Sequence, residues 1–320
     1  MSEETLQVVV RRREVQGRDV VVLDLAAADG AELPPFDAGA HVDLHLGDGL
    51  VRQYSLCGNP AERRTYRLGI LRDPNSRGGS VAAHERLGEG ARVEIGVPRN
   101  HFPLAADARR SILVGGGIGV TPMIAMAHVL HDRGQPFALH YCGRSRASCA
   151  FLDELAAAPF AGAVHTHFDD ADDAQRLDLP AILAGADAGT HLYVCGPAGF
   201  MDWVIAEAGR LGLAPGQIHK EYFQVEAAAG GGRAFDVTLA RSGRTLRVAE
   251  GQSIVEALAG VDVKIKVSCE QGVCGTCLCT VLAGTPEHRD VFLTDEEKAD
   301  NDQILLCCSR ALSDTLVLDL

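Results

Sequence analysis

The sequence lacks the features that place a chain in a membrane or on a polyanion. Its 320 residues contain no apolar run approaching the roughly 18 residues of a membrane-spanning helix. The first residues form neither a basic nor an apolar segment, so we expect no export signal and a cytoplasmic protein. The formal net charge is −13, and such a surface argues against nucleic acid and anionic lipid as partners.

Two motifs are also missing. Structural zinc sites usually show two short Cys-x2-Cys pairs, and this chain has one such pair, Cys274 and Cys277. The strict Gly-x-Gly-x-x-Gly dinucleotide fingerprint is absent because Val120 stands where the third glycine would fall. A structural zinc site is therefore a secondary interpretation, and any nucleotide-binding turn must depart from the strict glycine pattern.

A short cysteine-rich loop carries the clearest chemical signal. Cys269, Cys274 and Cys277 follow the spacing Cys-x4-Cys-x2-Cys, which is typical of a plant-type [2Fe–2S] cluster with a distant fourth thiolate. Gly272 and Gly275 lie between them, and glycine permits the tight backbone curl that such a loop needs. We predict a two-iron cluster here, against the alternatives of zinc or of buried free cysteines.

The fourth ligand is less clear from spacing. Cys307 lies thirty residues after Cys277, and Cys308 follows it directly, so spacing alone leaves both open. Cys279 is expected on a strand that leaves the loop, and a small buried residue is the simpler interpretation of it and of Cys308.

Residues 1–104 predict an antiparallel β-barrel or sandwich. Short runs of alternating, β-branched residues are separated by glycine, proline and aspartate. The expected strands are Gln7–Arg11, Val20–Leu25, Val42–Leu46, Arg52–Leu56, Thr65–Leu71 and Arg92–Ile95.

Two features of this region suit a phosphorylated cofactor. Arg52, Tyr54 and Ser55 place a guanidinium, an aromatic ring and a hydroxyl along one strand. Gly79 and Ser80 then open a predicted helix, whose free N–H groups and positive dipole end favour an anion. Arg52 would add a bidentate phosphate contact.

Residues 105–226 predict an α/β doubly wound domain. The strand Ser111–Val114 leads into Gly115-Gly116-Gly117-Ile118-Gly119-Val120-Thr121-Pro122 and then into a helix, the unit that binds dinucleotides. Further strands are expected at Phe137–Tyr141, Val164–Phe168, His191–Cys195 and Ile218–Phe223, alternating with helices at Phe151–Ala157, Leu179–Leu183 and Gly199–Leu211. The alternation implies a parallel sheet with its ligands at the carboxyl ends of the strands.

Residues 227–234 read as a small-residue linker, and residues 235–320 as an α+β module of the β-grasp type. A hairpin is expected over Phe235–Val248. Ser253 and Glu256 form a capping box for the following helix. The cluster loop, an acidic helix over Asp295–Ala299 and a last strand over Thr315–Leu318 complete the module.

The order of these three motif sets resembles one family. An Arg-x-Tyr-Ser barrel, a nucleotide domain with Gly-Gly-Ile-Gly-Val-Thr-Pro and a later Cys-Gly-Pro, and a C-terminal plant-type ferredoxin module are similar to the reductase components of two-component Rieske oxygenases, of the phthalate dioxygenase reductase and vanillate O-demethylase reductase type. The likeness covers essentially the whole chain.

The resemblance implies FMN in the barrel, NADH in the α/β domain and roles for individual residues. Phe223 is implied to cover the flavin face until nicotinamide arrives, and the family ending Cys-x-Ser-Arg selects Cys307 as the fourth cluster ligand. Phe223 and Cys195 are the implied catalytic residues. The implied cofactor contacts are Arg52, Tyr54, Ser55, Gly69, Ile70, Leu71, Arg72, Gly79 and Ser80 for the flavin, and Gly116, Gly117, Gly119, Thr121, Cys195, Gly196 and Pro197 for the nucleotide.

The implied function is an NADH-dependent reductase that passes electrons from NADH to FMN, to the [2Fe–2S] cluster, and to the Rieske centre of a separate oxygenase or O-demethylase in aromatic catabolism. NADH delivers two electrons as hydride and the cluster accepts one at a time, so a group between them must hold a stable one-electron state, which a flavin can do. Alternatives remain: FAD with another monooxygenase or ferredoxin as acceptor, a non-enzymatic redox sensor or carrier, or NADPH bound through Arg144 and Arg146.

Overall fold

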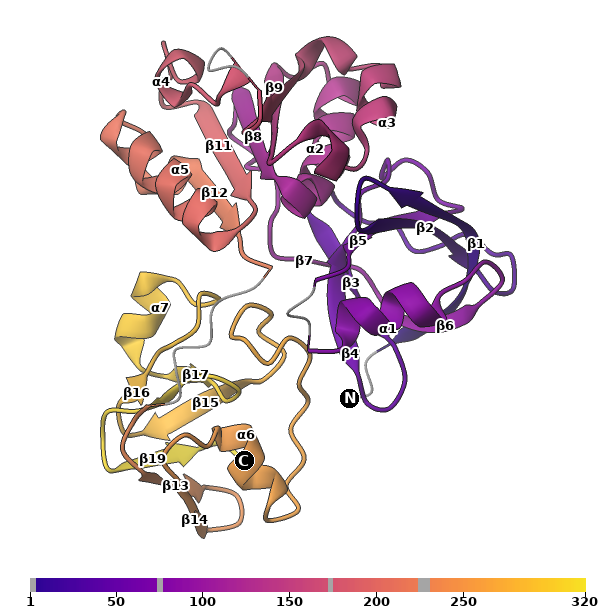
Figure 1. The fold of residues 1–320 in the computed structure, drawn as a ribbon. Helices are drawn as coiled ribbons and strands as arrows, with labels where there is room; N and C mark the ends of the chain where they lie inside the picture. Colours follow the sequence, from indigo (N-terminus) through magenta and orange to yellow (C-terminus); the bar gives the residue numbers. More distant parts are fainter. Residues whose placement is uncertain (1–3, 74–76, 172–174, 224–230) are drawn as a thin grey trace. The chain divides into compact units, whose positions relative to one another are not determined.

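The computed structural model describes residues 4–73, 77–171, 175–223 and 231–320 (Figure 1). The chain divides into two compact units, Met1–Phe223 and Gln224–Leu320. Half of the predicted linker, residues 227–230, lies outside the described residues. No helix in the described ranges is both long enough and apolar enough to cross a bilayer.

The first unit begins with an antiparallel sheet of seven strands. Its order is β4-β3-β6-β1-β2-β5, with β7 paired to β3. A bridge between Leu56 and Leu68 brings the two ends of this order together, so the sheet curls on itself as predicted. Helix α1 (Gly79–Arg86) follows β5. The strands are β1 (Thr5–Gln16), β2 (Val20–Ala27), β3 (Ala40–His45), β4 (Val51–Ser55), β5 (Tyr66–Leu71), β6 (Arg92–Gly96) and β7 (Arg99–Asn100).

A parallel sheet of five strands follows, in the order β10-β9-β8-β11-β12. Parallel neighbours need crossover connections, and helices supply them, which confirms the predicted doubly wound class. Several bounds differ from expectation by one residue, and three differ by two: β8 and β9 continue through Gly116 and Gly143, and β12 ends at Glu221 instead of Phe223. The elements are β8 (Arg110–Gly116), α2 (Val120–Asp132), β9 (Phe137–Gly143), α3 (Leu152–Ala157), β10 (Val164–Phe168), α4 (Leu179–Ile182), β11 (Thr190–Cys195), α5 (Ala198–Arg210) and β12 (Ile218–Glu221).

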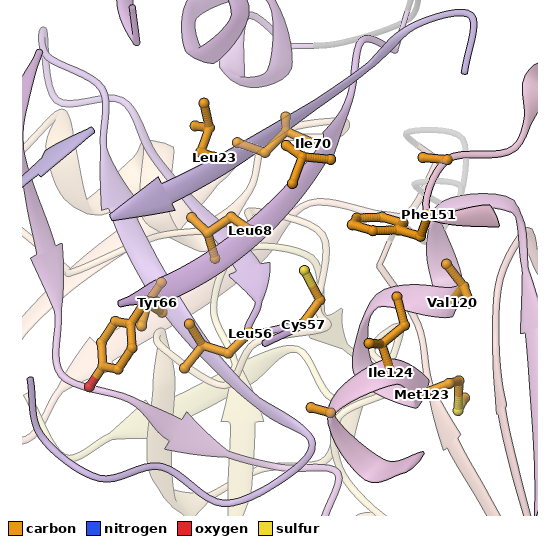
Figure 2. Close-up of a cluster of buried hydrophobic side chains, with 14 of the residues drawn as sticks. Leu23, Leu56, Cys57, Tyr66, Leu68, Ile70, Val120, Met123, Ile124 and Phe151 are labelled. Carbon is orange, nitrogen blue, oxygen red and sulfur yellow. The ribbon is translucent and has the colours of Figure 1, made fainter. Parts of the chain in front are cut away.

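The two sheets of the first unit share one hydrophobic core. Figure 2 shows Leu68 and Ile70 of β5 on one side, and Ile124 of α2 with Phe151 on the other, within one cluster of buried side chains. Because this cluster is continuous, the positions of barrel and parallel sheet are fixed by packing. The barrel and the parallel sheet therefore form one packed body.

The second unit is a mixed sheet with its own core. Its order is β14-β13-β19-β15-β17, in which β13 and β19 are parallel and the other neighbours antiparallel. Both hydrogen bonds of the predicted Ser253–Glu256 capping box are present at the start of α6. The elements are β13 (Phe235–Leu239), β14 (Arg244–Val248), α6 (Ile254–Ala259), β15 (Leu278–Ala283), β16 (Pro286–Glu287), α7 (Asp295–Asp300), β17 (Gln303–Leu305), β18 (Arg310–Ala311) and β19 (Thr315–Leu318).

Candidate functional site

The start of α1 and strand β4 meet at Arg52. Its Nη1 donates to the Val51 carbonyl at 2.7 Å and its Nη2 to the Arg77 carbonyl at 3.1 Å. A Cβ on Gly79 would lie 2.4 Å from Arg52 Cγ, so only glycine lets the arginine lie across the helix start. Helix α1 has no acidic residue in its first turn. A guanidinium therefore lies against a free, positively polarised helix N-terminus, which suits a phosphate.

Strand β5 contacts the nucleotide half through Gly69. A Cβ at this position would lie 2.6 Å from Phe151 Cζ and 3.0 Å from Thr121 Cγ2. Thr121 is itself fixed, since its hydroxyl donates to the Ile118 carbonyl at 2.9 Å. Two residues predicted for different cofactors, Gly69 for the flavin and Thr121 for the nicotinamide, thus lie side by side.

The glycine-rich turn after β8 packs backbone to backbone against the turn after β11. A Cβ on Gly119 would lie 2.3 Å from the Cys195 carbonyl oxygen, and one on Gly196 would lie 3.0 Å from Gly116 Cα. A Cβ on Gly116 would meet the Phe200 ring at 2.8 Å and Pro197 at 3.2 Å. The missing side chains bring the two predicted nucleotide turns into direct contact.

Glu221, which we did not single out from sequence, joins the two halves. Burial raises the pKa of Glu221 to about 8, and a hydrogen bond with the Ser55 hydroxyl opposes that rise. The other carboxyl oxygen, Oε2, is buried without a hydrogen-bond partner. Burial, and next the nearby Glu221 carboxyl, raise the pKa of the Cys195 thiol. Glu221 therefore lies between Ser55 of β4 and Cys195 of β11.

The other predicted site residues differ in their exposure to solvent. Phe223 is half-buried and packs against the shared core. Burial raises the pKa of Tyr54 to about 12, against the opposing charge of Arg52, so its hydroxyl stays protonated. Leu71 is exposed, and Arg72 lies at the surface with its guanidinium 3.4 Å from Glu85.

The polar groups of this region fit a flavin. Gln53 Nε2, like Glu221 Oε2, is buried with no hydrogen-bond partner among the described residues. Buried polar groups without partners cost about 1–3 kcal/mol each, and a flavin ring edge offers both donors and acceptors. With the helix N-terminus and Arg52 for its phosphate, this half of the unit has the donor set that a flavin phosphate needs.

Four cysteine sulfurs converge in the second unit. Hydrogen bonds join Cys269 to Cys274 and to Cys307, and join Cys307 to Cys277. The first two of these contacts, from Cys274 and then Cys307, lower the pKa of the Cys269 thiol. Burial of three of the four sulfurs shows that the cage is largely closed to solvent.

The loop around these sulfurs is shaped for an inorganic core. Gly272 and Gly275 have φ of +74° and +72°, and a Cβ on Gly275 would lie 2.3 Å from the Phe292 ring. Backbone N–H groups of Gln271 and Val273 donate to Cys269 Sγ. N–H groups directed at ligand sulfurs tune the potential of such clusters.

The arrangement also bears on zinc. Within the described ranges, no three His, Cys, Asp or Glu side chains are arranged around a single metal ion. A [2Fe–2S] cluster divides its four thiolates between two irons, so it does not need such a group.

Comparison with known proteins covers both units. Residues 237–312 match the 2Fe-2S iron-sulfur cluster binding domain family, and residues 98–218 match the N-terminal domain of dimethylamine monooxygenase subunit DmmA-like proteins. The chain is 48% identical to a vanillate O-demethylase oxidoreductase of Pseudomonas sp. (strain HR199 / DSM 7063), over 98% of this chain and 100% of the relative.

Solved structures agree with this result. A phthalate dioxygenase reductase, described as a modular structure for electron transfer from pyridine nucleotides to [2Fe–2S], is 38% identical, with a TM-score of 0.76 over 99% of this chain and 98% of that one. An intact type IV self-sufficient cytochrome P450 monooxygenase is also 38% identical, with a TM-score of 0.85 over 99% of this chain. The present chain spans only 41% of that longer protein.

Proposed function

The chain belongs to the phthalate dioxygenase reductase and vanillate O-demethylase reductase family, and from that premise we propose its flavin, its ligands and its partner. Members of this family carry electrons from NADH through a flavin to a [2Fe–2S] cluster. The flavin is FMN, held by residues 1–104, and NADH binds to residues 105–226. Residues 235–320 carry the cluster, and the acceptor is the Rieske centre of a separate oxygenase or O-demethylase.

The observation that supports this function best is the line of contacts between the two cofactor regions. Ser55 of the flavin strand reaches Glu221, which lies beside Cys195 of the nicotinamide turn. Gly69 on the other flavin strand touches Thr121. Hydride transfer needs the reacting atoms about 3–3.5 Å apart, and adjoining subsites on one rigid core can provide that.

The chain's own groups have distinct tasks in this proposal. A bound flavin supplies the chemistry that accepts an electron pair and releases electrons singly. Arg52 and the α1 N-terminus orient its phosphate. Glu221, protonated at neutral pH because its pKa lies near 8, holds a proton between Ser55 and the nicotinamide turn. Phe223 excludes water from the site until nicotinamide displaces it.

The preference for NADH over NADPH is supported by charge at the end of β10. The Asp169 N–H donates to the Gly143 carbonyl at 3.0 Å and the Asp170 N–H to the Arg144 carbonyl at 3.2 Å, which places two acidic residues beside Arg144. Carboxylates at the carboxyl edge of such a sheet favour a ribose hydroxyl over a phosphate.

Flavin extraction and cofactor kinetics test this proposal together. We expect the mass of the released flavin to be that of FMN, and kcat/KM for NADH to exceed that for NADPH by at least about 10-fold, which corresponds to about 1.4 kcal/mol of transition-state preference. Release of FAD, or equal use of both nucleotides, would contradict the proposed assignment.

The fourth cluster ligand can be identified by paired variants. Cys307 is proposed as the ligand because it contacts Cys269 and Cys277. Cys308 Sγ instead lies 3.7 Å from Ser309 Oγ and would lie 2.6 Å from a Cβ on Gly272. We expect Cys308→Ala to keep two irons per chain and Cys307→Ala to lose most of its iron, because the thiolate is the ligand. Iron analysis and the visible spectrum measure both, and the opposite pattern would make Cys308 the ligand.

A further inference from the structure

The ferredoxin module contains one histidine, and it has no hydrogen-bond partner. His288 is the only histidine between residues 231 and 320, and it follows β16. Its side chain is 10% exposed, and neither Nδ1 nor Nε2 makes a hydrogen bond within the described part of the chain. Burying such a ring without a hydrogen bond costs free energy, so stability does not explain its presence.

A buried carboxylate lies beside this ring. Asp290, whose side chain is fully buried, has Oδ1 3.5 Å from His288 Nδ1. The Leu293 N–H donates to Asp290 Oδ2 at 2.9 Å and the Ser309 hydroxyl to Oδ1 at 3.3 Å. A neutral imidazole gains little at this separation. A protonated ring would place its positive charge next to the Asp290 carboxylate and would direct an N–H donor at that carboxylate.

The pair contacts both segments that carry the cluster ligands. A Cβ on Gly272 would lie 2.9 Å from Asp290 Cα, and the Val291 N–H donates to the Gly272 carbonyl at 3.1 Å. Ser309, which binds Asp290, lies two residues after Cys307. An electron added to the cluster therefore adds negative charge to a loop that Asp290 contacts, and the His288 ring lies 3.5 Å from the Asp290 carboxylate.

Other charges around the ring act in both directions. Glu287 and Arg289 flank His288 and bind each other, with Arg289 Nε and Nη2 at 2.9 and 2.7 Å from Glu287 Oε1, so these charges largely offset. Lys298 of α7 donates to the Asp290 carbonyl at 2.8 Å. Arg310 of β18 pairs with Glu287, next to His288, and its positive charge, like that of Lys298, acts against a second positive charge on the ring. The Asp290 carboxylate and the electron added to the cluster both favour a positive charge on the ring.

We propose that His288 takes up a proton when the cluster accepts an electron, so that the reduction potential of the cluster depends on pH. This rests on the proposed function, since it requires the two-iron cluster in the cysteine cage. One electron passes from the reduced flavin to the cluster, one proton leaves a solvent acid and forms an N–H bond at a ring nitrogen, and no bond between heavy atoms changes. Histidine is the side chain that ordinarily titrates between about pH 5 and 8.

The sign follows from the direction of proton transfer. Because a proton enters with the electron, the potential falls as pH rises. It is flat at low pH, where the ring is protonated in both redox states, and flat at high pH, where it is protonated in neither. Between these two pH ranges, the equilibrium constant for cluster reduction falls at most tenfold per pH unit, which lowers the potential by about 59 mV for one electron.

The test is a redox titration of the full-length holoprotein from about pH 5.5 to about pH 9, following the electron paramagnetic resonance signal of the reduced cluster. We expect a falling potential in the natural protein and a flat profile in His288→Gln and His288→Asn. His131→Gln, at an exposed histidine of the first unit, should keep the slope.

Two results would overturn the inference: a flat profile in the natural protein, or an unchanged slope in both His288 variants. If neither variant assembles a cluster, the pH dependence of the cluster potential in the natural protein tests the inference by itself. Absence of any reduced-cluster signal in the natural protein is a different failure, because it would contradict the proposed function itself.

Discussion

Replacement of Cys274 by serine is expected to lower electron delivery to a one-electron acceptor such as cytochrome c by at least about 100-fold, while NADH still reduces the flavin. Removing a group that hydrogen-bonds to a metal ligand already lowers metal affinity or activity by roughly 10–100-fold. Serine at this position removes the thiolate itself, and a hydroxyl does not ionise at neutral pH. Cys274 lies in the cage through its contact with Cys269.

The measurement compares two rates in one preparation. Anaerobic flavin bleaching by NADH reports the first unit, and cytochrome c reduction reports the whole path. Cys279→Ser is the matched control, because Cys279 is a buried strand residue whose sulfur is directed at the Thr280 carbonyl, 3.6 Å away. Equal survival of both rates in Cys274→Ser would show that electrons leave from the flavin.

Gly119→Ala is expected to lower kcat/KM for NADH by about 100-fold. The new Cβ would lie 2.3 Å from the Cys195 carbonyl oxygen and 2.6 Å from the Gly196 nitrogen, and backbone atoms cannot rotate away as a side chain can. The two nucleotide turns must separate, and a displacement of about 1 Å at a hydride-transfer site costs on the order of 100-fold. Flavin content and the cluster spectrum should be unchanged.

The matched control for this change is Gly199→Ala. Gly199 belongs to α5, directly after the same turn, and a Cβ there meets nothing within 4 Å. Its kcat/KM should stay within about twofold of the natural value, as expected of a substitution that touches nothing. A similar loss in both variants would indicate that the effect arises from the helix, not from contact between the turns.

Local signals in the sequence predicted the features that depend on nearby residues. The Ser253–Glu256 capping box and the strand Thr315–Leu318 both follow from short-range chemistry. The three-part fold class followed from the change in hydrophobic period along the chain and is confirmed by the sheet orders.

Features that depend on distant pairing were not predicted. Strands β7 and β17 are too short to show a period, and they exist because β3 and β15 offer free edges to pair with. Glu221 gains its role only where β12 meets β4, because its partner Ser55 lies far away in the sequence. His288 and Asp290 form a pair beside a loop that ends more than ten residues earlier.

The central claim is that two-electron chemistry at the flavin precedes one-electron chemistry at the cluster. Anaerobic stopped-flow mixing with NADH, followed at separate flavin and cluster wavelengths, tests it most directly. We predict that flavin absorbance bleaches first and that cluster bleaching follows as a distinct slower phase. Bleaching of the cluster before the flavin, or without it, would contradict this account.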